Sequence, residues 1–563
     1  MAPRIENAPG RRRWIEVSTL GDLVDRRAVE HPDGEALVFP DRRASYPELA
    51  GRAQELAQGL AGLGVGRGDR VGILLPASVD LVATLLAAAK LGAIAVPVNA
   101  RFRSTELRQI VAHSGMAVLV TAPDHLPLVA ESLPDLAGQT AGELACAAAP
   151  ELRHVLLLGA PAPAPASIAS ALTGPGRLAA TAVPDSDVWS EQESVCVRDT
   201  AVIVYTSGTT AAPKGAMLSH EALVRLATGI GDRLAYTPAD RVWTAIPLFH
   251  GGGITFALSC LAAGATFVHP GFFDPSTTLE YLRDERVTVA LAAFETIWMP
   301  VLNRADFASF DLSRIRVVMA VGVPERLRDM VSRLPDATHV SCVAMTESSA
   351  FLTLNRLDDP PEARATTGGH PMPGMRCRVV DPETGLDLAP GTPGELLFRG
   401  PNAFDGYFRD PELTAQVFDE HGWFHSGDLV VADDDGRLTF RSRLKDMLKV
   451  GGENVAAAEV EGFLLGHPAV DMVAVVAAPD ARYVEVPAAY VVLAPGARAS
   501  ERELVEFCLG RIATYRVPRY VRFVTEYPMS GTKIKKFVLR ERIAAELAAA
   551  GVTEAPKLRV PAE

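Results

Sequence analysis

A short loop rich in hydroxyl groups, glycine and positive charge indicates phosphate chemistry. Residues 205–215 read YTSGTTAAPKG, and eight of these eleven residues bear a hydroxyl group or are glycine or lysine. The apolar run 201–204 just before it predicts a buried strand, so the loop follows a strand end. Such a loop turns backbone N–H groups towards an anion and predicts a phosphate-binding site. The residues expected to contact phosphate are Thr206, Ser207, Gly208, Thr209, Thr210 and Lys214.

The loop differs from a Walker A loop, because Lys214 is followed by glycine and no Gly-x-x-x-x-Gly-Lys-Ser/Thr pattern is present. Lysine is rare in this chain and makes up only 8 of the 55 lysine and arginine residues. A lysine ammonium is a compact charge on a flexible stem, whereas a guanidinium is a planar fork. We therefore expect lysine where arginine cannot serve, with chance codon usage as the alternative. Six of the lysines form three short segments: Lys214; Lys445 and Lys449; and Lys533, Lys535 and Lys536.

The stretches around the loop alternate between helix and strand patterns. Residues 49–63 and 81–91 show helical periodicity, while 71–75 and 93–98 are short apolar runs typical of strands. This alternation predicts an α/β fold built on mixed, mostly parallel sheets. Residues 131–199 are rich in alanine and proline, so we expect a surface excursion there.

A chain of 563 residues is too long for one core and predicts two or more domains. We expect a flexible tail at 1–17 and a large N-terminal domain at 18–440. The short strands and Gly/Pro turns of 376–440 predict a small β subdomain within it. A charged hinge at 441–446 then leads to a smaller, mobile α+β domain at 447–563.

Composition argues against several classes of protein. The formal net charge of −13 argues against nucleic-acid binding. The six cysteines show no CxxC or metal-ligand spacing, which predicts reduced thiols in a cytoplasmic protein. The N-terminus has no apolar core of a secretory signal. The most apolar stretch, 81–98, contains Lys90 and Gly92 and divides into a helix and a strand, so no membrane span is expected.

Further motifs follow the loop in order. They are Met345-Thr346-Glu347, the GELLFRGP segment at 394–401, GWFHSGDL at 422–429, KVGGENV at 449–455, and YPMSGTKIKKF at 527–537. Together with the loop they resemble the adenylate-forming enzymes, such as acyl-CoA synthetases, firefly-type luciferases and peptide-synthetase adenylation domains. The resemblance covers nearly the whole chain and implies that ATP, Mg²⁺ and CoA are used.

By this resemblance, Thr206 and Glu347 would hold Mg²⁺ and serve catalysis, and Thr346 would contact the α-phosphate. A carboxylate that faces phosphates needs a hard cation between them. Asp428 and Arg443 would bind the ribose, because a carboxylate offers two acceptor oxygens to a diol. The other positions expected to line the nucleotide are Gly322, Val323, Pro324, Val343 and Ala344, the last two replacing a Tyr-Gly pair of the family.

The resemblance also assigns roles near the C-terminus. Lys445 falls at the hinge about which the last domain would rotate. Lys533 takes the place of a catalytic lysine that bridges the attacking carboxylate and the α-phosphate oxygens. The chain is one residue short before Lys533, so Lys535 is an alternative. The loop that would line CoA after rotation contributes Lys449, Gly451 and Gly452.

The acid substrate is expected to be apolar. His250 matches a position that gates the acyl site, and the aromatic residues of 246–261 and 289–303 would wall it. No charged side chain there is placed to pair with an amino acid's ammonium group. The sequence thus predicts an AMP-forming ligase that joins a fatty, aryl or bulky natural-product acid to CoA. The alternatives are an enzyme that passes acyl-AMP to a partner enzyme or carrier protein, and a degenerate nucleotide-binding homologue. The oligomeric state stays open, with a homodimer as one option.

Overall fold

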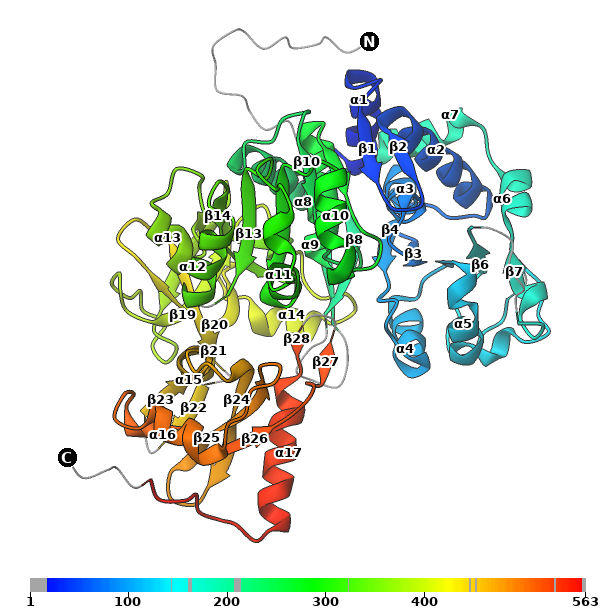
Figure 1. Cartoon of the computed structure of the whole chain (residues 1–563). Coiled ribbons are helices and arrows are strands. Elements are labelled where there is room, and N and C mark those ends of the chain that lie inside the picture. Colours follow the sequence, from blue (N-terminus) through cyan, green and yellow to red (C-terminus); the bar gives the residue numbers. More distant parts are fainter. Residues whose placement is uncertain are drawn as a thin grey trace.

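The chain forms a large N-terminal α/β domain and a smaller C-terminal domain, drawn in orange and red at the lower end of Figure 1. The expected fold class is therefore confirmed. This computed structural model describes residues 18–142, 144–159, 165–206, 214–322, 324–444, 447–450, 453–530 and 533–558. Within these residues, no helix has the length and apolar character that crossing a membrane requires.

Two seven-stranded sheets form the centre of the N-terminal domain. In each, neighbouring strands are parallel except for one antiparallel pair at an edge, β8–β9 in the first sheet and β1–β2 in the second. The first sheet has the order β7 (Leu172–Thr173), β6 (His154–Leu157), β5 (Val118–Thr121), β3 (Arg70–Leu74), β4 (Ile94–Pro97), β8 (Thr200–Thr206) and β9 (Lys214–Ser219). The second has the order β14 (Thr338–Val340), β13 (Val317–Val321), β12 (Val289–Phe294), β10 (Arg241–Trp243), β11 (Thr266–Val268), β1 (Glu35–Val38) and β2 (Arg43–Ser45).

Two smaller antiparallel sheets complete this domain. One contains β15 (Cys342–Met345), β16 (Ala350–Leu354) and β17 (His370–Pro371). The other contains β18 (Arg376–Val380), β19 (Gly394–Arg399), β20 (Phe424–Ala432) and β21 (Leu438–Arg443). Since β21 continues through Arg443, the expected hinge at 441–446 begins inside the last strand of this sheet.

The C-terminal domain has a sheet of its own, in which β25 pairs with the antiparallel β24 and the parallel β26. It touches the large domain where the Arg326 guanidinium donates to the Asp471 carbonyl oxygen at 2.6 Å. The strands of this domain are β22 (Met447–Val450), β23 (Glu453–Ala456), β24 (Val470–Asp480), β25 (Val484–Leu493), β26 (Tyr520–Phe523), β27 (Met529–Ser530) and β28 (Lys533–Ile534), and the last two form a separate hairpin.

Helices cover the sheets of both domains (Figure 1). They are α1 (Leu20–Glu30), α2 (Tyr46–Gly62), α3 (Val79–Lys90), α4 (Ser104–Ser114), α5 (Leu126–Ser132), α6 (Pro175–Thr181), α7 (Asp185–Ser194), α8 (His220–Arg233), α9 (Gly251–Ala263), α10 (Pro275–Asp284), α11 (Glu295–Leu302), α12 (Pro324–Arg333), α13 (Pro361–Thr366), α14 (Pro411–Val417), α15 (Ala457–Leu465), α16 (Glu501–Cys508) and α17 (Lys536–Ala549).

Local signals explain where α2 and α3 begin and how deeply they pack. Ser45 caps α2 in a capping box with Glu48, which satisfies two otherwise unpaired N–H groups of the first turn. Helix α3 is buried along its length, and its last residue, Lys90, is fully buried. Its ammonium pairs with Asp25 at 2.5 Å and donates to the Gln192 side chain at 3.1 Å. These two contacts replace the water that a buried charge loses.

The interpretation of residues 131–199 as a surface excursion is wrong. β6 and β7 lie in this stretch and extend the first sheet at its edge. Helices α6 and α7 pack against α2, so closely that a Cβ built on Gly62 would lie 1.8 Å from the Thr181 carbonyl oxygen. Small side chains permit this approach, and the strands are too short to show a period in the sequence.

Candidate active site

The expected phosphate loop connects two paired strands. β8 and β9 run antiparallel, with Thr206 opposite Lys214 where the paired residues end. The Thr206 hydroxyl donates to the Lys214 carbonyl oxygen at 3.5 Å. The structure thus places Thr206 and Lys214 side by side. The connecting residues lie outside the described part of the chain and include the expected Ser207, Gly208, Thr209 and Thr210.

A buried polar contact fixes the end of β8. The Tyr205 hydroxyl lies 2.7 Å from His113 Nδ1 on α4. Burial raises the pKa of Tyr205 and lowers the pKa of His113, so this contact joins a neutral hydroxyl and a neutral imidazole. The His113 carbonyl oxygen accepts in turn from the Arg409 guanidinium at 3.1 Å. The residue before Thr206 is therefore held by His113, which Arg409 holds in turn.

A bridging segment, residues 404–408, joins the β8–β9 hairpin to Glu347. Asp405 N donates to the Met217 carbonyl oxygen at 2.9 Å, which attaches the segment to β9. The preceding residue reaches the other side, because Phe404 N donates to the Glu347 carbonyl oxygen at 2.9 Å. Glu347, 133 positions after Lys214 in the numbering, is thereby brought to the exit of the phosphate loop.

Tyr407, in the bridging segment, lies between Lys214 and Glu347. Its hydroxyl donates to Glu347 Oε1 at 2.8 Å. The Lys214 ammonium lies 5.5 Å from the centre of the Tyr407 ring, within the range of a cation–π contact. Burial and then the charge of Glu347 raise the pKa of Tyr407, while the nearby Arg443 opposes this rise. The hydroxyl is therefore a neutral donor, and Arg443 belongs to the same group of side chains.

Glu347 lies on a strained turn beside the start of α9. The turn Thr346–Ser348 is followed by Ser349 and Ala350, whose φ angles of 61° and 118° are both positive. Helix α9 supports this turn, because the Thr255 hydroxyl donates to the Ser349 carbonyl oxygen at 3.0 Å. His250 directly precedes α9, and its ring centre lies 4.6 Å from that of Phe249.

Asp428 and Arg443, the two residues expected at the ribose, pair with one another. They are opposite one another on β20 and β21, and the Arg443 Nε lies 2.6 Å from Asp428 Oδ1. The Asp428 side chain is 3% exposed and that of Arg443 is 38% exposed. A carboxylate held in this way is oriented by its partner while the arginine reaches solvent.

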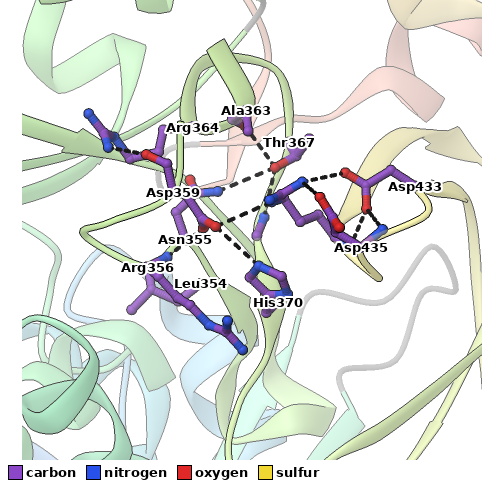
Figure 2. A network of polar contacts seen from close by, with 12 residues as sticks. Leu354, Asn355, Arg356, Asp359, Ala363, Arg364, Thr367, His370, Asp433 and Asp435 are labelled. Atoms are coloured by element: carbon purple, nitrogen blue, oxygen red, sulfur yellow. Dashed lines mark hydrogen bonds and ion pairs between the residues drawn. The ribbon is translucent and has the colours of Figure 1, made fainter. Parts of the chain in front are cut away.

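The far end of the β20–β21 hairpin is anchored by the network in Figure 2. Arg437 pairs with Asp433 at 3.0 Å and reaches the buried Asp359 at 3.3 Å. His370 also lies 3.1 Å from Asp359. Burial opposes ionisation of Asp359, but hydrogen bonds from the Arg356 N–H, His370 and Arg437 outweigh it and lower the pKa of its carboxyl group. The hairpin that carries Asp428 is thus fixed at its turn.

The expected nucleotide-lining positions divide into exposed and buried ones. Val321 ends β13 and is 37% exposed, Gly322 follows it, and Pro324 begins α12. Val323 lies outside the described residues. Of the pair on β15, Ala344 is exposed, whereas Val343 is buried in the main core. Only Ala344 of that pair therefore presents its side chain to solvent.

The C-terminal lysines are described in part. The backbone of Lys449 lies in β22 and that of Lys533 in β28, whose hairpin with β27 is drawn at the end of the C-terminal domain that faces the large domain (Figure 1). Lys535 directly precedes α17. Lys536 pairs with Glu461 at 2.6 Å. Outside the described residues lie Lys445, Gly451 and Gly452.

Two of the aromatic residues expected to wall the acyl site belong to the core. Trp298 is 1% exposed, and its indole N–H donates to the Met319 carbonyl oxygen at 2.9 Å. Phe256 is also 1% exposed and packs on Phe351 with ring centres 4.9 Å apart. Phe249 and Phe294 are half-buried, so they are the better candidates for contact with a substrate.

Comparison with known proteins identifies the family. The model of the AMP-binding enzymes matches residues 24–408, and that of the AMP-binding enzyme C-terminal domain matches residues 459–533. The chain belongs to the AMP-binding enzyme family. The resemblance inferred from the sequence motifs is thereby confirmed.

Relatives of this AMP-binding enzyme span its full architecture. It is 34% identical to a Bacillus subtilis protein named as an acyl-CoA synthetase, YngI, over 93% of this chain and 97% of that protein. It is also 34% identical to a feruloyl-CoA synthase from Amycolatopsis, over 93% and 99% of the two chains. Among solved structures, an anthranilate CoA ligase in complex with anthranoyl-AMP matches with a TM-score of 0.81 and 27% identity, covering 95% of this chain and 98% of that one.

The side chains of this AMP-binding enzyme fit a magnesium ion that is held together with phosphates. The described residues contain no group of three or more His, Cys, Asp or Glu side chains that could hold a metal ion by themselves. Mg²⁺ bound through one carboxylate and substrate phosphates needs no such group. Glu347, whose Oε1 accepts from Tyr407, would supply that carboxylate, and Thr206 at the end of β8 would supply a hydroxyl.

One residue of the site could not be recognised from the sequence motifs. That residue is Tyr407, to which the sequence motifs assigned no role. Its position just after Gly406 was the available signal, since a glycine beside a large side chain marks a close approach of the backbone.

Proposed function

We propose that this AMP-binding enzyme activates an apolar carboxylic acid with ATP and transfers the acyl group to CoA. An AMP-forming acid–CoA ligase agrees with the names of both curated relatives. The observation that carries the proposal is the grouping of Lys214, Tyr407 and Glu347 beside the Asp428–Arg443 pair. It supplies a cation for phosphates, a carboxylate for a metal ion and a carboxylate for a ribose.

The reaction has two steps. In the first, a carboxylate oxygen of the acid bonds to the α-phosphorus of ATP, and the bond to pyrophosphate breaks. In the second, the CoA sulfur bonds to the acyl carbon, AMP leaves with the electrons of the acyl C–O bond of the mixed anhydride, and the thiol proton goes to solvent. Both steps bring together or release anions, so positioning and positive charge supply most of the catalysis.

Different residues of the chain have separate roles in these two steps. Thr206 and Lys214 bind the phosphates at the end of β8, and Asp428 accepts hydrogen bonds from the ribose. Lys533, on the β27–β28 hairpin, bridges the attacking carboxylate and the α-phosphate. A Mg²⁺ ion held by Glu347 would reduce the negative charge of the phosphates.

The apolar character of the acid rests on the residues around α9 and the end of β12. Helix α9 begins after Phe249 and His250, and β12 ends at the half-buried Phe294. The similar proteins named feruloyl-CoA synthase and anthranilate CoA ligase are named for aromatic acids. Aryl acids should therefore lead the test panel, with fatty acids and bulky natural-product acids beside them.

Product mass spectrometry tests the proposal. The full chain is incubated with ATP, Mg²⁺, CoA and the panel of acids, and an acyl-CoA product for at least one apolar acid is expected. Acyl-AMP without thioester would indicate instead that the adenylate is handed to a partner enzyme or carrier protein. If neither product forms across the panel, the proposed function is wrong. A Glu347→Gln variant serves as the inactive control.

A further inference from the structure

Tyr407 contacts a cation with its ring and an anion with its hydroxyl group. Its ring lies 5.5 Å from the Lys214 ammonium, and its hydroxyl donates to Glu347 Oε1 at 2.8 Å. We propose that Tyr407 is a positioning residue that orients the Glu347 carboxylate for a divalent cation and holds the Lys214 ammonium for the phosphates of ATP. This inference rests on the proposed function, because it assigns those two ligands to the same site.

The surroundings of Tyr407 leave its ring little freedom. Its backbone N–H donates to the Thr414 hydroxyl at 2.9 Å, and its backbone forms a β-bridge with Ala216 of β9. Its ring packs on that of Phe404 in an edge-to-face contact with ring centres 4.9 Å apart. Tyr407 as a whole is only 6% exposed. Because two contacts fix the backbone and the ring is packed and buried, the hydroxyl is placed reproducibly.

The residue before it makes this placement possible. Gly406 has a φ of 127°, which L side chains rarely adopt. A Cβ built on Gly406 would also lie 2.7 Å from Thr414 Cγ2. The backbone can therefore turn here and pass Thr414 only as glycine, and this turn directs the ring of Tyr407 towards Lys214 and Glu347.

An aromatic ring suits this position better than a direct ion pair. If Lys214 bound Glu347 directly, the strong attraction in a partly buried site would compete with phosphate and with a metal ion. A cation–π contact holds the ammonium more weakly, so phosphate oxygens can take it over. The hydroxyl donates to one carboxylate oxygen and leaves the charge of Glu347 in place. The cation and the anion are thus both kept available.

Calorimetric titration of the full chain with ATP tests the inference, once with Mg²⁺ and once with a chelator. Tyr407→Phe removes only the hydroxyl and should weaken binding of Mg·ATP about tenfold, because a hydrogen bond to a charged group is lost. Its affinity for metal-free ATP should stay within about twofold of wild type. Tyr407→Leu also removes the ring and should weaken the binding of metal-free ATP too.

Tyr281→Phe is the matched control, because its hydroxyl donates to the His269 carbonyl oxygen at 3.0 Å, away from the site. Both of its affinities should equal those of wild type. The inference is overturned if Tyr407→Phe binds Mg·ATP like wild type. It is also overturned if Tyr407→Phe loses both affinities equally together with a lower Tm. Binding is measured without acid or CoA, so a wild-type protein that forms no acyl-CoA would refute the proposed function alone.

Discussion

Replacing Asp428 by alanine should abolish recognition of the ribose while leaving the fold intact. The Asp428 carboxylate is 3% exposed, so its hydrogen bonds to a ligand are protected from water. A hydrogen bond to a charged group contributes about 1.5–3 kcal/mol, which corresponds to about 10- to 150-fold in affinity. Its partner Arg443 is 38% exposed and can be hydrated after the change, so the loss in unfolding free energy should be about 1 kcal/mol.

The assay combines the variant with modified nucleotides. Wild type should bind 2′-deoxy-ATP and 3′-deoxy-ATP about 10- to 150-fold more weakly than ATP, because each lacks one hydroxyl group. Asp428→Ala should bind all three with similar, reduced affinity. Asp435→Ala is the control, since Asp435 lies at the turn of the same hairpin and is 67% exposed. If Asp428→Ala still discriminates between ATP and the deoxynucleotides, the assignment of Asp428 to the ribose is wrong.

Three further changes address catalysis, pH and stability. Lys533→Ala should slow adenylation about 100-fold or more, yet leave thioester formation from supplied acyl-AMP intact. Equal loss of both half-reactions would contradict this role. Burial lowers the pKa of His220 from 6.5 to about 4, so between these two values the imidazole binds a proton in the unfolded chain but not in the folded one. The free energy of unfolding, measured in urea, should therefore fall as the pH drops from 6.5 towards 4. This dependence on pH should be weaker in His220→Asn, and an equal dependence in the variant would exclude His220 as a cause. Lys90→Met should lower the unfolding free energy by about 3 kcal/mol, because it leaves Asp25 without its buried partner. A loss below about 1 kcal/mol would show that Asp25 is well hydrated on its own.

Local sequence signals predicted the elements that carry the phosphate loop. The run 201–204 lies inside β8, and the helical period of 49–63 matches α2 closely, because apolar spacing and caps act over a few residues. Contacts between distant residues were beyond such signals. Tyr407 and Glu347 are 60 positions apart, and only the fold brings them together. For the same reason no local signal indicated that Lys536 pairs with Glu461.

The contact between Arg326 and the Asp471 carbonyl oxygen has a consequence for sequence variation at these two positions. A main-chain acceptor is present whatever side chain position 471 carries, whereas the donor depends on the arginine. If the C-terminal domain rotates between the two steps, as the family resemblance implies, this hydrogen bond of about 1 kcal/mol can be exchanged for water each time. Among natural variants, position 471 should therefore accept many different residues, while position 326 should keep a side chain that donates a hydrogen bond.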